Sequence, residues 1–108
     1  MTSEQVNDIM DVACYGAINY WALNVEPQED EGQGPQFKIY TEEGEQFTVG
    51  RLSIEQAMLD LWTGKIEVRS DIQQAIGLAI FEEEYGEIDS TAADCIIQAA
   101  CFQEVVYG

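Results

Sequence analysis

The chain has 108 residues, of which 46% are hydrophobic, and it carries 21 Asp and Glu residues against 4 Lys and Arg residues, with no His. This length fits one domain, and the hydrophobic content argues against global disorder. The formal net charge of −17 argues against direct nucleic-acid binding, because affinity for DNA comes mainly from Lys and Arg side chains. A field of this sign also repels anionic membranes and attracts basic surfaces.

The N-terminal segment is predicted to form an amphipathic helix. Thr2 and Gln5 have the spacing of a capping box, and apolar residues recur at helical spacing from Val6 to Trp21. The Tyr15–Trp21 segment closes this helix and places large aromatic rings next to small residues. We expect it to mark the centre of the core.

A loop and a β-hairpin are predicted next. Residues 24–36 are rich in Glu and Gly and hold both prolines of the chain, which predicts an acidic mobile loop. Residues 37–41 and 46–49 alternate between apolar and polar side chains on either side of an acidic turn. This pattern predicts a hairpin, with Gly44 at a position of positive φ.

Three more helices are predicted in the C-terminal half. Ser53 and Gln56 form a second capping-box pattern, and Gly64 is placed to end that helix. The next two helices have capping residues at their expected starts: Ser70 or Asp71, and Asp89 or Ser90. The last seven residues either finish the fourth helix or add a short strand. The predicted fold is α+β, with about four helices and one β-hairpin in a single domain spanning residues 1–108.

The three cysteines, Cys14, Cys95 and Cys101, show no CxxC spacing. The N-terminus has no basic region followed by an apolar run, and no stretch approaches the roughly 18 apolar residues of a membrane helix. We therefore expect free thiols in a reducing cytoplasm.

Catalytic and cofactor motifs are scarce. The absence of His removes the commonest general base and metal ligand. The sequence contains no Walker-type phosphate loop and no EF-hand loop, and its cysteines have no basic neighbours in sequence. We expect a protein that is not an enzyme and that has no metal or cofactor.

The acidic residues themselves are the candidate site. Three carboxylates near the end of the third helix, Glu82 to Glu84, oppose the helix dipole without a visible local gain, and such violations tend to mark function. Helical neighbours lie about 5–6 Å apart, close to the repeat of phosphates along a strand. Two candidate partner-binding strips result. The first comprises Glu82, Glu83, Glu84, Glu87 and Asp89, and the second comprises Glu42, Glu43 and Glu45 with Glu26, Glu29, Asp30 and Glu31.

The two ends of the chain resemble a group of small tailed-phage proteins that are largely of unassigned function. That group carries a Gly-Ile-Asn-Tyr-Trp-like segment in its first helix and ends in a Phe-Gly-Glu-Ile-Val-Tyr-Gly-like sequence. The matching segments here are Ala17–Trp21 and Phe102–Gly108, with Ala17 and Gln103 in place of glycines. The resemblance implies a phage or prophage origin and carries over no catalytic residue.

Charge and resemblance together predict an acidic phage-encoded inhibitor that acts in the cytoplasm of the infected bacterium. Its expected partner is a basic host complex that binds nucleic acid, with a CRISPR effector as the first candidate and a restriction enzyme as the second. Carboxylates would occupy the Lys/Arg surface of that complex, without direct contact to nucleic acid or membrane. Whether the chain is a monomer or a homodimer stays open.

Two other functions also fit the sequence. One is a non-enzymatic binder that sequesters a small signalling molecule, with Asn19, Tyr20 and Trp21 lining a pocket. The other is a structural or housekeeping phage protein whose acidity only keeps it soluble.

Overall fold

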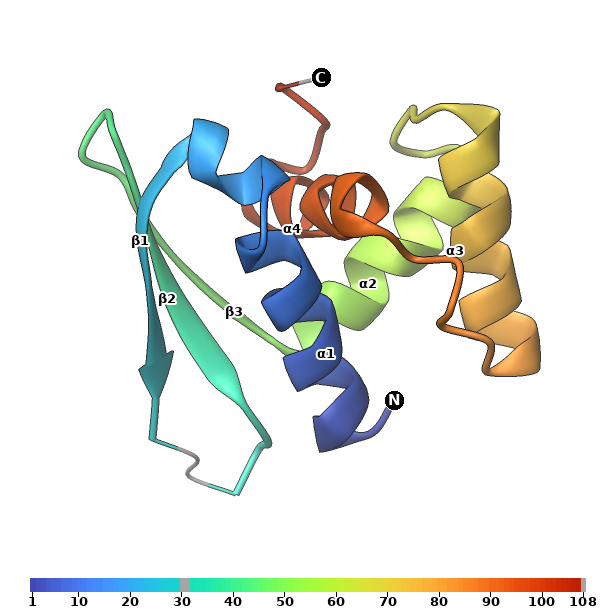
Figure 1. Cartoon of the computed structure of the whole chain (residues 1–108), viewed down its shortest axis with the longest axis horizontal. Helices are drawn as coiled ribbons and strands as arrows, with labels where there is room; N and C mark the ends of the chain where they lie inside the picture. The colour runs from blue at the N-terminus through green and yellow to red at the C-terminus, as the bar shows by residue number, and fades with distance from the viewer. Residues whose placement is uncertain (30–31, 108) are drawn as a thin grey trace.

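Three antiparallel strands form one layer of the fold, and helices pack on one side of it (Figure 1). The computed structural model describes residues 1–29 and 32–107. The elements of this described part are α1 (Ser3–Cys14), a 3-10 helix (Ala17–Tyr20), β1 (Ala22–Gln28), β2 (Gln36–Thr41), β3 (Gln46–Gly50), α2 (Arg51–Trp62), α3 (Ser70–Glu82) and α4 (Ser90–Phe102). The predicted α+β class with four α-helices and a hairpin is confirmed, and the described residues add a third strand.

The third strand, β1, corrects the expectation that residues 24–36 form a loop. It pairs antiparallel with β2, placing Val25 opposite Ile39 and Pro27 opposite Phe37. Proline is tolerated here because β1 is an edge strand, whose outer side needs no ladder hydrogen bonds. The expectation was therefore wrong for the part up to Gln28, where the Pro and Glu content hid a short edge strand without regular alternation of burial.

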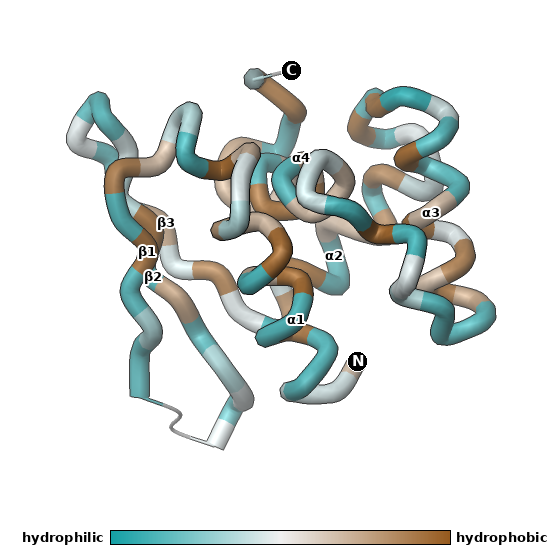
Figure 2. Tube along the Cα trace, viewed as in Figure 1, coloured by the Kyte–Doolittle hydropathy of each residue, from teal (hydrophilic) through white to brown (hydrophobic). Residues whose placement is uncertain are grey.

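Helix α4 occupies the centre of the molecule. It contacts α1, α2, α3 and β3, and its side chains are buried from Ala92 through Ala99. A helix that is covered on all sides is a core helix, and the small alanines on it let its neighbours approach closely. In contrast to α4, the turn between β2 and β3 and the segment after α3 are mainly hydrophilic (Figure 2).

The Tyr15–Trp21 segment is only partly core, which corrects a second expectation. Helix α1 ends at Cys14, and the chain continues as the 3-10 helix. Ile18 and Trp21 are buried, whereas Tyr15 and Tyr20 are 93% and 86% exposed. A 3-10 helix has three residues per turn, so Ile18 and Trp21 share its inner side while Tyr20 points away.

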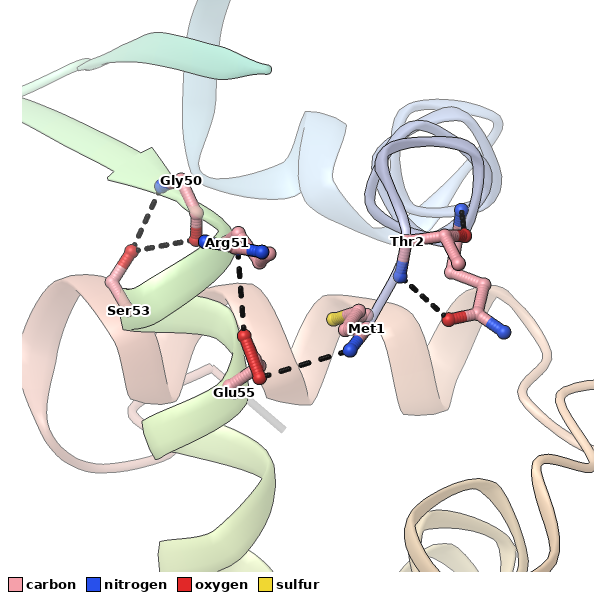
Figure 3. Close-up of polar contacts among 7 residues, drawn as sticks. Met1, Thr2, Gly50, Arg51, Ser53 and Glu55 are labelled. Atoms are coloured by element: carbon pink, nitrogen blue, oxygen red, sulfur yellow. Dashed lines mark hydrogen bonds and ion pairs between the residues drawn. The ribbon is translucent and has the colours of Figure 1, made fainter. Parts of the chain in front are cut away.

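The helix starts differ in how well the sequence predicted them. The Thr2 capping box is confirmed: the Gln5 N–H donates to Thr2 Oγ1 at 3.1 Å, and the Thr2 N–H donates to Gln5 Oε1 at 2.9 Å (Figure 3). Ser53 was expected to cap α2, but α2 already begins at Arg51, directly after β3. Ser53 Oγ instead accepts from the Gly50 N–H at 2.8 Å, which gives this backbone donor a partner at the junction of β3 and α2.

Other predicted helix and turn signals are mostly confirmed. Gly44 and Gly64 have φ values of 86° and 83°, as expected for the hairpin turn and the end of α2. Asp89 caps α4 by accepting from the Ala92 N–H at 2.8 Å. Helix α3 starts at Ser70, with Arg69 rather than Ser70 or Asp71 at the N-cap position.

Candidate functional site

The first acidic strip lies at the end of α3 and in the segment leading to α4. Its described side chains are all exposed: Glu82, Glu83, Glu84, Glu87 and Asp89. The helical spacing assumed from the sequence does not extend along it, because α3 ends at Glu82 and Glu83 has a left-handed φ of 55°. Glu83 lines a cleft together with Glu55 and Tyr85, whereas Glu87 and Asp89 line a different cleft beside α3.

The second strip is divided between the two ends of the sheet. Glu42, Glu43 and Glu45 lie in the turn between β2 and β3, and Glu29 follows the end of β1. The register of the strands pairs Ala22 with Thr41 and Gln28 with Gln36, so the turn and Glu29 lie at opposite ends (Figure 1). Asp30 and Glu31 fall outside the described residues. The structure therefore presents separate acidic surfaces rather than one strip.

Glu26 differs from the other predicted site residues because its neighbours already engage it. Its carboxylate accepts from Asn24 Nδ2 at 3.0 Å and from the Tyr40 hydroxyl at 3.3 Å. Lys38 is its cross-strand partner on β2. A carboxylate with these partners has less charge to offer to another molecule.

Two of the four basic side chains, Arg51 and Arg69, form ion pairs within the described residues. Arg51 Nε lies 3.7 Å from Glu55, and the N-terminal amino group lies 3.9 Å from the same carboxylate (Figure 3). Arg69 contacts Asp71 at 3.2 Å. Within residues 1–29 and 32–107, these are the ion pairs, so none of the described carboxylates of the two strips is in an ion pair.

A cleft of about 780 Å³ opens where the 3-10 helix meets the C-terminal segment. It lies between the 3-10 helix, the loop before α3, the first half of α4 and the C-terminal segment. Val68, Ile72, Val105 and Val106 form its apolar wall, and the polar side chains among its lining residues are Tyr20, Glu67, Arg69, Thr91, Asp94 and Tyr107. The cleft thus unites the two segments that carry the phage resemblance.

A buried polar network forms the floor of this cleft. Asp94 is 6% exposed, and its Oδ1 accepts from the Trp21 indole N–H at 2.6 Å. Its Oδ2 accepts from Gln98 Nε2 at 2.8 Å. Burial raises the pKa of Asp94, and the hydrogen bonds from Trp21 and Gln98 oppose that rise only in part.

Gln98 ties the C-terminal segment to α4. Its Oε1 accepts from the backbone N–H groups of Val106 and Tyr107 at 2.9 and 2.8 Å, and its Nε2 donates to the Tyr107 carbonyl at 2.8 Å. The Tyr107 ring then stacks on Trp21 with centroids 6.1 Å apart. Neither alternative left by the sequence describes residues 103–107: α4 ends at Phe102, and these residues form neither helix nor strand.

The sequence reasoning found one part of this site and missed the rest. Tyr20 lines the cleft, whereas Trp21 is buried beneath it and Asn19 faces a neighbouring shallow hollow. Asp94 and Gln98 are not among the predicted site residues, although a carboxylate between Ala93 and Cys95 on the apolar side of a helix is a signal for a buried polar site. Charged side chains are almost never fully buried unless they are paired.

The cysteines are poor nucleophiles in this fold. Burial raises the pKa of Cys95 to about 11, with further increases from the Asp94, Asp89 and Asp71 charges. Burial alone raises the pKa of Cys101 to about 12. The pKa of Cys14 is raised by burial and then by Asp11. Because the thiolate is the reactive species, all three thiols are held in the unreactive form.

The remaining searches of the described residues give negative findings. No three of their His, Cys, Asp and Glu side chains converge as a metal site, and none of their helices is both long and apolar enough to cross a membrane. No known family model matches the chain, and no characterised protein or solved structure is significantly similar to it.

Proposed function

We propose that this chain is an acidic inhibitor, of phage origin, of a host defence complex that binds nucleic acid. The partner is a CRISPR effector complex in the first instance and a restriction enzyme in the second. The inhibitor occupies the Lys/Arg-rich surface that otherwise holds DNA or RNA. The phage origin rests on the resemblance of the two terminal segments, and the mechanism rests on charge.

The observation that carries this proposal is the density of unpaired negative charge. Setting aside Asp30 and Glu31, the net charge of −17 becomes −15 for the described residues, whose longest dimension is 32 Å. Dividing this length by the charge gives one net negative charge per about 2.1 Å, compared with about 1.7 Å of axis in B-DNA. This charge is spread over the faces of a globule rather than along one axis, so a basic surface that evolved to hold a duplex meets part of it on the face that it contacts.

The placement of the carboxylates also supports binding by occlusion. The acidic groups lie in the turn between β2 and β3, after β1 and after α3, so they surround the molecule rather than forming one helical row. With few free cations on the surface, the long-range field is negative in most directions, which accelerates association with a basic partner and makes it sensitive to salt.

A DNA competition assay tests the proposal. Labelled target DNA is bound to a purified CRISPR effector complex, or to a restriction enzyme, and its displacement by the chain is followed by fluorescence anisotropy at low and high NaCl. We expect displacement at low salt that weakens steeply as salt rises. Failure to displace DNA from either class of complex, or displacement that salt does not change, would overturn the proposal.

Charge-reversal variants then locate the contact. Three triple variants carry the same change in net charge: Glu82, Glu83 and Glu84 to Lys; Glu42, Glu43 and Glu45 to Lys; and Glu4, Asp8 and Asp11 to Lys on the exposed side of α1. The variant whose substitutions lie in the contact surface should displace far less DNA than the α1 control variant. An equal loss in all three variants would mean that net charge acts without a defined contact surface.

A further inference from the structure

The cleft between the 3-10 helix and the C-terminal segment has the composition of a site for a cationic side chain. We propose that it receives an arginine or lysine side chain from the basic partner protein, which anchors the complex. This inference deepens the proposed function and rests on it for the nature of the partner. The volume of the cleft, about 780 Å³, lies within the range of about 300–1,000 Å³ that is usual for ligand sites, so one long side chain and its neighbours fit.

An anionic ligand does not suit this cleft. Arg69 is the one cation among its lining residues, and Nε and Nη2 of Arg69 already donate to the two carboxylate oxygens of Asp71 at 3.2 and 3.3 Å. This bidentate pair neutralises the arginine at the edge of the cleft. An incoming phosphate or carboxylate would compete with Asp71 for this guanidinium and would also face the net charge of the whole chain, −17.

The acceptors that remain favour a cation. Glu67 lines the cleft with an exposed carboxylate that is in no ion pair among the described residues. Asp94 lies at the floor with each oxygen accepting one hydrogen bond, from Trp21 and from Gln98. A carboxylate has about four lone-pair sites, so Asp94 keeps acceptor capacity toward the cleft.

The non-polar lining matches the rest of an arginine or lysine side chain. Val68, Ile72, Val105 and Val106 offer an apolar wall for the aliphatic stem, which long cationic side chains commonly bury while keeping the charged head at polar groups. Tyr20 is 86% exposed, so its ring is available to the cationic head, whereas the Tyr107 ring, 41% exposed, stacks one face on Trp21. Exposed tyrosines beside an acidic cleft also have the character of interface anchors.

An NMR titration with a single-residue probe tests the site apart from any partner. The ¹⁵N-labelled chain is titrated with N-acetyl-arginine amide and, as the matched uncharged control, with N-acetyl-citrulline amide. We expect saturable shifts with arginine, at a Kd of about 1–10 mM, in residues 17–20, 67–69, 91–95 and 105–107 and in the Trp21 indole N–H. The citrulline probe should leave these signals nearly unchanged.

Two substitutions at the cleft and one remote control make the test specific. Glu67→Gln and Tyr20→Ala should each weaken arginine binding about fivefold or more, and both side chains are exposed, so the fold tolerates their loss. Glu43→Gln in the β2–β3 turn removes the same charge far from the cleft and should leave binding unchanged. Shifts spread evenly over the acidic surface, equal shifts with citrulline, or no effect of Glu67→Gln would overturn the inference.

The two proposals can fail separately. If the chain displaces DNA from its partner and neither Tyr20→Ala nor Glu67→Gln alters displacement or arginine binding, the cleft inference is wrong and the inhibitor proposal stands. If arginine binds the cleft in a saturable way while no DNA-binding complex is inhibited, the cleft is a cation site and the inhibitor proposal is wrong.

Discussion

Replacing Gln98 with Met should remove the connection between α4 and the C-terminal segment. The substitution keeps the length of the side chain but removes four hydrogen bonds: one to Asp94, and three to the backbone of Val106 and Tyr107. Each backbone bond contributes about 0.5–1.5 kcal/mol net, and the bond to the charged Asp94 contributes about 1.5–3 kcal/mol. The free energy of unfolding should therefore fall by about 3–7 kcal/mol, a large part of the total of about 5–15 kcal/mol for a domain.

The loss can be measured by urea unfolding, with hydrogen exchange to show where it arises. The amides of Val106 and Tyr107 should lose protection, because their acceptor is Gln98 Oε1. Gln56→Met is the matched control: Gln56 is exposed on α2 and donates only to Asp60 at 2.8 Å, so its loss should cost about 0.5 kcal/mol or less. A cost for Gln98→Met below about 1 kcal/mol, with both amides still protected, would refute the role assigned to this network.

Three shorter predictions follow from other buried groups. The raised pKa of Asp94 means that folding favours its protonated form, so its contribution to stability is full below the unfolded pKa of about 3.9 and is lost as pH rises through the folded pKa. The free energy of unfolding should thus fall with rising pH more steeply in the wild type than in Asp94→Asn, and parallel curves would contradict this. Gly77→Ala should lower the free energy of unfolding, measured in urea, by about 1–3 kcal/mol, because the new Cβ would lie 2.5 Å from the Trp62 ring. The loss is expected although Ala favours helix more than Gly does, and a stabilised variant would show that the ring moves freely. At pH 8, iodoacetamide should modify half-buried Cys14 well before Cys95 and Cys101, as read by mass spectrometry, and equal rates would show that burial does not control the thiols.

Local signals in the sequence predicted the elements whose conformation is decided locally. The Thr2 capping box, the Asp89 cap and the positive φ values of Gly44 and Gly64 each depend on a few neighbouring residues, and all are confirmed. Strand β1 was missed for the opposite reason. Its pairing with β2 across the 29–35 connection outweighs the unfavourable strand propensity of its Glu and Pro residues, and propensity is only a weak guide in sheets.

The cleft could not be predicted because it depends on four segments that are distant in the sequence. Nothing local indicates that Tyr20, Glu67, Asp94 and Tyr107 line one space. Two of these segments come from Ala17–Trp21 and Phe102–Gly108, for which the sequence analysis gave a resemblance. The fold explains why they belong together: Trp21 contacts the rings of both Phe102 and Tyr107, at 5.2 and 6.1 Å between centroids.

The net charge that supports the proposed function should also weaken the fold at low ionic strength. Two like charges separated by the radius of gyration, 12.6 Å, repel by about 0.3 kcal/mol in water, compared with about 0.1 kcal/mol at the radius of about 33 Å expected for the unfolded chain. The difference is small for one pair but is repeated over many pairs. Folding therefore compresses the charges, and the repulsion is strong when the Debye length, about 30 Å in 0.01 M salt, exceeds the radius of gyration of 12.6 Å.

Raising NaCl from 10 to 500 mM should consequently stabilise the chain by about 2–4 kcal/mol, since the Debye length falls well below the molecular radius and counterions screen most of the pairs. A six-site variant gives the control, with Gln at positions 42, 43, 45, 82, 83 and 84, which lowers the net charge from −17 to −11. These side chains are exposed and in no ion pair among the described residues, so the variant should be more stable at 10 mM NaCl and should respond less to added salt. If added salt raises the stability of wild type and variant equally, the stabilisation comes from general salting-out of apolar surface rather than from screening. The acidic surface then does not destabilise the fold.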